Sequence, residues 1–161
     1  MAVNNGKTPI VLAVLALIFS GISTYFSLTA IHVNQDSARA QLFSNFQQQY
    51  SAIAAQFPTK HFDQDWIPET GTEDWLRLKR YWDLCYVEWY ATRRLQPALY
   101  GRLWNDFYAQ AIGDALEYPS LRSVLIDLMV QQQDKSPQKH DFFEALRVLA
   151  WTRGVSLERS H

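Results

Sequence analysis

The sequence predicts an all-α protein in which one N-terminal transmembrane helix precedes a compact helical bundle. The first observation is that residues 9–31 contain no Asp, Glu, Lys, Arg or His. The second is that apolar residues after this segment recur every three or four positions, as in amphipathic helices. The third is that the 130 residues after Ile31 contain no other uncharged run of this length. A chain of that size buries one hydrophobic core, so we expect a single water-facing domain.

The uncharged segment 9–31 follows a short polar tail, residues 1–8, and is long enough to cross a bilayer. As a helix it would reach about 34 Å, and a hydrocarbon core is about 30 Å thick. A cleaved signal peptide is the alternative, with small-x-small sites at residues 21–23 or 38–40. The run exceeds the apolar region of about 7 to 15 residues in such a signal, which favours a retained span in the cell membrane.

Small residues follow one side of the predicted span at alternating spacings of three and four. They are Ala13, Ala16, Ser20, Ser23, Ser27 and Ala30. Small side chains let two helices approach closely in lipid, and a mean spacing of 3.5 fits a left-handed crossing. We therefore expect an interface with a second copy of the chain or with another membrane protein, the homo-oligomer being the simpler case. The alternative is that such residues are common in any membrane helix.

The charge balance excludes some partners. The formal net charge is −1, and because Lys7 is the only charged residue before His32, the remaining chain carries −2. This balance predicts no nucleic-acid partner and no polybasic patch that would bind anionic lipid. Basic residues flank the span equally, Lys7 against Arg39, so the positive-inside rule leaves the side of the soluble domain open.

The next segment, residues 32–57, predicts an amphipathic stalk helix. The residues that recur about every four positions are Leu42, Phe46, Tyr50 or Gln49, Ile53 and Phe57. The stalk either continues the span without interruption or restarts at a cap near Asn34 or Asp36.

The segment 58–154 predicts the bundle. Four helices are expected, near 73–95, 97–117, 119–132 and 137–153, with a flexible tail at 155–161. In the first of them, Trp75, Trp82 and Trp89 lie seven residues apart. Apolar residues extend around most of this helix, so we expect it at the centre of the bundle.

Asp83 and Glu88 interrupt the apolar surface of that central helix and, with Arg93, form a candidate polar pocket. A polar group among aromatic side chains is typical of a ligand site or of proton chemistry. The alternative is a structural ion pair or a solvated edge. The two carboxyls differ by about 140° in direction, so this helix alone does not pair them.

Catalytic and metal-binding patterns are weak. The sequence contains no glycine-rich phosphate loop, no G-x-S-x-G and no H-E-x-x-H. His61, Asp63 and Asp65 alternate in a loop, where a solvated turn is the more ordinary interpretation than a metal site. Cys85 is the only cysteine, which excludes an intrachain disulfide. We predict no cofactor, no metal and no catalytic residue.

The run 88–95, EWYATRRL, followed by 103–108, LWNDFY, resembles an uncharacterised group of short bacterial membrane proteins. The resemblance covers about a third of the domain and consists mainly of aromatic residues at helical spacing. It implies one N-terminal span, a helical domain and a bacterial membrane, and it implies no activity.

Two functions are therefore expected. The first is a non-enzymatic, membrane-anchored interaction or regulatory module that self-associates. The second is a membrane-tethered small-molecule-binding or catalytic domain, with an aromatic pocket around Trp82, Glu88, Trp89 and Trp104.

Overall fold

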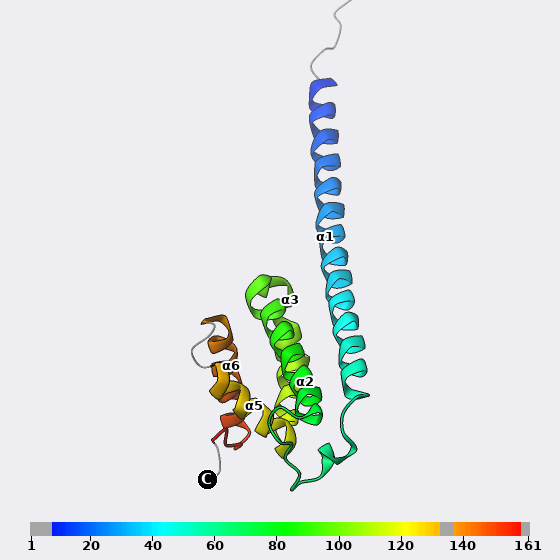
Figure 1. Ribbon diagram of the computed structural model, residues 1–161. Coiled ribbons are helices and arrows are strands. Elements are labelled where there is room, and N and C mark those ends of the chain that lie inside the picture. The colour runs from blue at the N-terminus through cyan, green and yellow to red at the C-terminus, as the bar shows by residue number, and fades with distance from the viewer. Residues whose placement is uncertain (1–7, 133–136, 159–161) are drawn as a thin grey trace, which may run out of the picture. The chain divides into compact units, whose positions relative to one another are not determined.

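The computed structural model describes the backbone of residues 8–132 and 137–158, and their side chains apart from 8–22, 24–26, 28, 132 and 138. All regular structure in these residues is helical, which confirms the predicted all-α class and helical bundle (Figure 1). The chain divides into two units, residues 1–40 and residues 41–161.

The first unit consists of the N-terminal part of helix α1, which runs from Thr8 to Ala54. Ser23, Ser27 and Ala30 are exposed, and the Ser27 hydroxyl donates to the Ser23 carbonyl at 2.8 Å. The other residues of the predicted small-residue interface, Ala13, Ala16 and Ser20, lie outside the described side chains.

Among the described residues, no helix offers a stretch both long and apolar enough to cross a membrane. Most side chains of the predicted span 9–31 lie outside that part of the structure, so the span stays a prediction.

The second unit begins with the C-terminal part of α1, which packs on the domain through its aromatic residues. Phe46 is buried, and its ring meets that of Tyr108 edge to face at 5.9 Å. Phe43 contacts the ring of Phe107 at 5.1 Å. After α1, a short 3₁₀ turn, η1 (Thr59–Phe62), leads into a loop that ends at Thr72.

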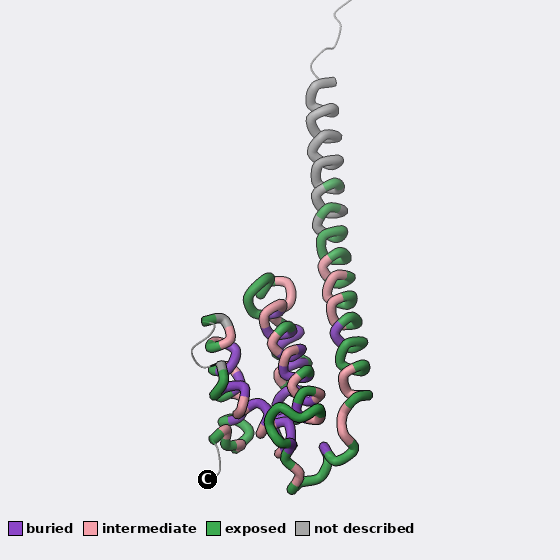
Figure 2. The backbone as a smooth tube through the Cα atoms, in the orientation of Figure 1, coloured by how far each residue is buried: buried purple, intermediate pink, exposed green. Residues whose placement is uncertain are grey.

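Helix α2 (Glu73–Tyr90) is the centre of the bundle. Thr72 caps it by accepting from the Trp75 backbone N–H, and Glu73 and Asp74 favour the positive helix start. Trp75, Trp82 and Trp89 are all buried. Helices α5 (Pro119–Gln132) and α6 (Pro137–Thr152) both contact α2, so neighbours cover α2 on more than one face (Figures 1 and 2).

Two π-helical turns divide the region in which the sequence predicts longer α-helices. The turn η2 (Ala91–Leu95) follows α2, and η3 (Trp104–Tyr108) separates α3 (Pro97–Leu103) from α4 (Ala109–Ala115). In η3, the Ala109 N–H bonds to the carbonyl of Trp104, five residues earlier. Such turns often occur at functional sites, and both turns adjoin residues of the predicted pocket.

The end of α6 is fixed to α4 by one arginine. Arg153 Nη1 donates to Asp114 at 2.8 Å and to Glu117 at 3.3 Å. Gly154 has a φ of +67°, which glycine adopts without strain, and the Val155 N–H then bonds to the Ala150 carbonyl at 2.9 Å. Val155 and Leu157 of the predicted flexible tail are half-buried, and residues 159–161 lie outside the described part.

Candidate functional site

The structure separates the three residues of the predicted polar pocket. Asp83 is partly exposed and forms an ion pair with Lys79, one turn earlier on α2. Glu88 is buried, with 7% of its surface exposed, and Arg93 is exposed on η2. The helical geometry explains this outcome, because five positions along a helix turn the side chain to a different face.

The buried Glu88 carboxyl lies in a cluster of weak acids. Burial raises its pKa from 4.5 to about 8, so it is protonated at pH 7. Burial, and then the Glu88 carboxyl, also raise the pKa values of the Cys85 thiol and the Tyr108 hydroxyl. The Tyr108 hydroxyl is buried and has no hydrogen-bond partner among the described residues. This arrangement keeps the cluster uncharged at neutral pH.

The predicted aromatic pocket is present in part. A cavity of about 300 Å³ lies beside Trp89 and Trp104, and its other lining residues include Arg93, Arg94 and Asp141. The Arg94 guanidinium lies 5.7 Å from the Trp89 ring and pairs with Asp141. Trp82 and Glu88 are not among the described lining residues, and the carboxyl at this cavity is that of Asp141.

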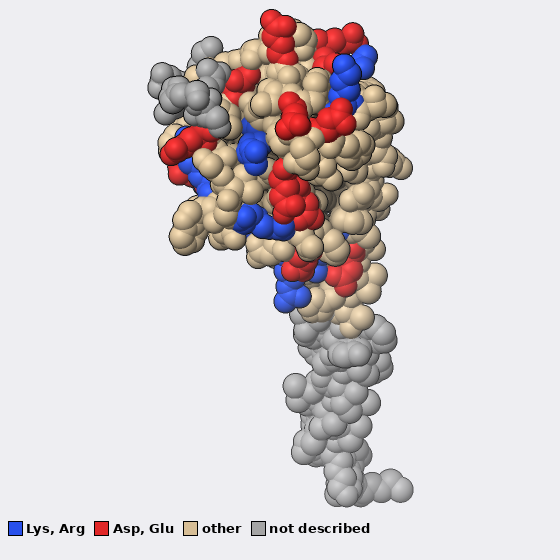
Figure 3. Space-filling view, turned by 90° about the horizontal axis from the view of Figure 1, so that it is seen from below, with Lys and Arg blue, Asp and Glu red and all other residues tan. Residues whose placement is uncertain are grey.

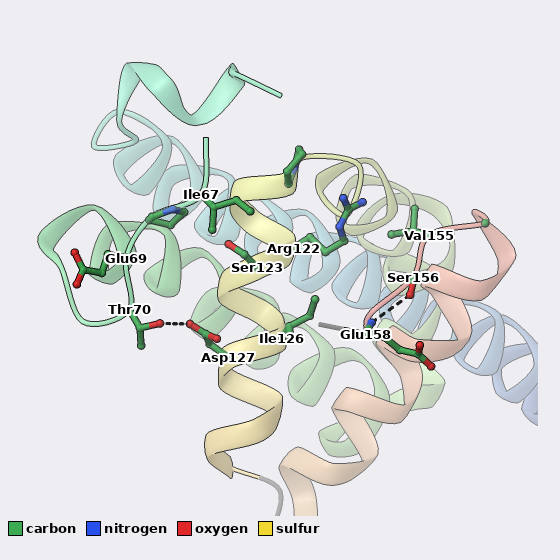
Figure 4. A pocket seen from close by; sticks show the side chains of 13 residues that line it. Ile67, Glu69, Thr70, Arg122, Ser123, Ile126, Asp127, Val155, Ser156 and Glu158 are labelled. Atoms are coloured by element: carbon green, nitrogen blue, oxygen red, sulfur yellow. Dashed lines mark hydrogen bonds between the residues drawn. The ribbon is translucent and has the colours of Figure 1, made fainter. Parts of the chain in front are cut away.

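A larger pocket of about 610 Å³ lies between the loop at residues 67–70, helix α5 and the segment 154–158 (Figure 4). Asp127 of α5 holds the loop in place by accepting hydrogen bonds from the Thr70 hydroxyl and, at 3.1 Å, from the Trp75 indole N–H. On the other side, the turn at Gly154 directs residues 155–158 toward α5.

The lining of this larger pocket is amphipathic. Ile67, Ile126 and Val155 supply apolar surface, and Arg122 supplies a positive charge (Figure 4). Glu69, Asp127 and Glu158 are the acidic lining residues. A concave site of this volume, in which apolar and polar side chains both line the wall, is suited to a small amphipathic molecule. The sequence offers little signal for it, because its residues come from two irregular segments and one helix.

A third cavity, of about 440 Å³, is lined by aromatic side chains from α1, η1 and α2 together with residues of α4 and α5. His61 belongs to this cavity and is buried, whereas Asp63 and Asp65 of the same loop are exposed. Within the described residues, no three His, Cys, Asp or Glu side chains come close enough to hold a metal ion.

The surface of the domain carries mixed charge. On the face drawn in Figure 3, acidic and basic side chains alternate without forming an extended basic area. This face therefore shows no continuous basic patch of the kind that contacts nucleic acid.

The fold and these cavities define the class of protein as an all-α helical domain with concave surface pockets. No protein-family model, no curated protein and no solved structure matches the chain. The resemblance to short bacterial membrane proteins therefore stays a prediction.

Proposed function

We propose that the protein is a membrane-anchored helical interaction module, in which residues 9–31 lie in a bilayer and the domain after residue 40 binds a partner. The observation that supports this proposal most strongly is the uncharged segment of 23 residues. It belongs to α1, the same helix whose later residues Phe43 and Phe46 pack on the domain. The segment proposed as the anchor and the first residues that pack on the domain therefore belong to the same helix.

Anchoring is tested by alkaline extraction of membranes that contain the full chain. We expect the wild type to stay in the membrane fraction. The double variant Leu17→Arg, Phe19→Arg should become extractable, because each arginine at the centre of a span costs about 2.5 to 3.5 kcal/mol of insertion free energy. The matched control is Gln48→Arg, Gln49→Arg, which adds the same charge at exposed positions of α1. Recovery of the wild-type chain in the wash would contradict the proposal.

Self-association through the small-residue seam is the second part of the proposal. Replacing Ala16, Ser20, Ser23 and Ser27 by Leu should reduce crosslinked dimer in membranes, because bulky side chains hold the helix backbones apart. The matched control replaces Val11, Ile18, Ile22 and Tyr25, on the opposite side of the helix, by Leu. Equal crosslinking of all three proteins would remove the interface from the proposal.

A second candidate function, binding of a small amphipathic molecule, is favoured by the pocket of about 610 Å³ beside α5. The test is saturation-transfer NMR of a set of small aromatic amines with the full chain in lipid nanodiscs, because three of the charged lining residues are acidic. Ser156→Trp places a bulky ring at an exposed lining position and should abolish the signals. The control Ser44→Trp, at an exposed position of α1 outside that lining, should retain them. Signals that are equal in both variants would exclude this pocket as the site.

A further inference from the structure

We propose that the aromatic cavity between η1, α2 and the end of α1 binds an organic cation, specifically a quaternary ammonium group. The cavity measures about 440 Å³. Six of its lining residues carry rings: Tyr50, Phe57, His61, Phe62, Tyr81 and Tyr118. Rings that line a concave site attract cations because the faces of aromatic rings are electronegative.

The rings form one continuous wall. Phe57 lies 5.0 Å from the ring of His61 and 6.1 Å from that of Tyr81. Tyr81 in turn lies 6.2 Å from Tyr50. On the other side, His61 lies 5.0 Å from Tyr118. Each of these distances is within the range of direct ring contact, so the wall is held by its own packing.

The cavity has a buried floor and an open mouth. His61 and Tyr81 are 4% and 5% exposed, whereas Phe62 is 66% exposed and Tyr50 43%. A ligand can therefore enter past exposed rings and lose water against buried ones. Loss of water strengthens a cation–π contact.

The electrostatics of the lining favour a cation over a neutral ligand. Among the described lining residues, Asp114 is the one acidic group, and none is lysine or arginine. Arg153 forms ion pairs with both Asp114 and Glu117. One arginine therefore neutralises only part of the negative charge of these two carboxylates. Lys60, next to His61 in the chain, is exposed and is not a lining residue.

His61 adds no positive charge to the floor. Burial lowers its pKa below the ordinary value of 6.5, so the imidazole is neutral at pH 7. Its Nδ1 lies 3.4 Å from the Ser120 hydroxyl oxygen, which fixes the ring at the floor. A neutral imidazole presents an aromatic face to a cation instead of repelling it.

A quaternary ammonium group fits these features better than a primary amine does. It has no N–H to donate, and aromatic side chains are the most frequent kind in the described lining of the cavity. The same group occurs on soluble choline-type metabolites and on the headgroup of phosphatidylcholine. Both sources are therefore compared in the experiment.

The test measures binding to the full chain in dodecyl maltoside, a detergent without ammonium groups, by isothermal titration calorimetry at pH 7. Choline is compared with 3,3-dimethyl-1-butanol, its neutral isostere, which has the same shape and lacks the charge. We expect choline to bind at least about tenfold more tightly. Equal affinity, or no binding of choline, would overturn the proposal.

Variants locate the site. Phe62→Leu removes a ring from the exposed mouth and should weaken choline binding about two- to fivefold. Tyr118→Leu removes a ring from the half-buried wall and should weaken it about tenfold. Tyr118→Phe keeps the ring and should bind as the wild type does. The control Trp151→Leu removes an exposed ring outside the cavity. If Phe62→Leu and Trp151→Leu bind choline equally, the proposed location is wrong.

The source of the ammonium group is distinguished in the same detergent, because the uncharged segment 9–31 would bring the full chain to any vesicle. Phosphatidylcholine or phosphatidylethanolamine is added to the micelles before choline is titrated. If the ligand is a lipid headgroup, phosphatidylcholine should weaken choline binding to the wild type and phosphatidylethanolamine should not. If the ligand is soluble, choline should bind equally in both kinds of mixed micelle. Both results support a quaternary ammonium site and differ only in its source.

Discussion

The Ser120 hydroxyl donates to the carbonyl of His61 at 3.0 Å, and the Ser120 hydroxyl oxygen also lies 3.4 Å from the His61 Nδ1. Because the hydroxyl hydrogen is used by the carbonyl, Nδ1 must be the donor in the second contact. Both residues are buried, so this pair joins the turn η1 to helix α5 in the interior. One small side chain thus satisfies two polar groups that would otherwise be buried without partners.

The first prediction is that Ser120→Ala lowers the free energy of unfolding by about 1 to 3 kcal/mol, because it leaves a buried carbonyl and a buried ring N–H unsatisfied. The measurement is urea denaturation of the full chain in dodecyl maltoside, followed by circular dichroism. The control is Ser123→Ala, whose hydroxyl bonds to the Ser120 carbonyl within α5 at a half-buried position. An equal loss of unfolding free energy in both variants would show that the contact with His61 adds no more stability than the hydrogen bond within α5 does.

The second prediction concerns Glu88 and pH. The pKa of this carboxyl is about 8 in the folded protein and 4.5 for an unperturbed glutamate. Between these values the folded chain holds a proton that the unfolded chain releases, so the free energy of unfolding should fall as pH rises. The expected loss between pH 5 and pH 8 is roughly 4 kcal/mol.

Glu88→Gln should remove this pH dependence, because the amide does not ionise, and should make the protein more stable than the wild type at pH 8. Asp83→Asn is the matched control on the same helix, since the Asp83 carboxyl is partly exposed and paired with Lys79. It should change the free energy of unfolding by no more than about 1 kcal/mol. Denaturation midpoints at several pH values would contradict the prediction if wild type and Glu88→Gln follow the same curve.

The all-α class and the central position of α2 could be predicted from the sequence, because both follow from local periodicity. Tryptophans at positions 75, 82 and 89 lie on one side of a helix in any fold, and burial of that side requires only a neighbour. The contrast between Glu88 and Asp83 could not be predicted. Both carboxyls interrupt the same apolar run, and which one faces a neighbour depends on where η3 and α6 pack.

Local sequence patterns could not predict the π-helical turns or the cavities either, because both depend on how the elements pack. Nothing in the spacing of apolar residues marks η2 or η3, since a single extra residue per turn hardly changes the periodicity. The aromatic cavity draws its lining from positions 50 to 121, and its rings are adjacent only because η1 packs on α5. In sequence, these aromatic residues are indistinguishable from ordinary core residues.

The third prediction concerns Asp127, which accepts hydrogen bonds from the Thr70 hydroxyl and the Trp75 indole. Asp127→Ala should lower the free energy of unfolding by about 1 to 3 kcal/mol, because the buried indole N–H loses its acceptor. Hydrogen exchange should also become faster in the loop 67–72, which forms one wall of the larger pocket. Asp127→Asn keeps an acceptor oxygen and should lose less. Unchanged exchange in Asp127→Ala would contradict the role of this residue in holding the loop.

The fourth prediction tests the central position of α2 with two leucines two residues apart. Leu78 is 0% exposed and Leu76 is 47% exposed. Leu78→Ala should lower the free energy of unfolding by about 2 to 5 kcal/mol, since it leaves a cavity among close-packed neighbours. Leu76→Ala makes the same chemical change on the outer face and should cost about 0.5 kcal/mol or less, because exposed side chains lose little burial. Urea denaturation of both variants measures the difference. Similar losses of unfolding free energy in both variants would mean that the Leu78 side of α2 does not face the core. That result would contradict the packing of α5 and α6 against α2.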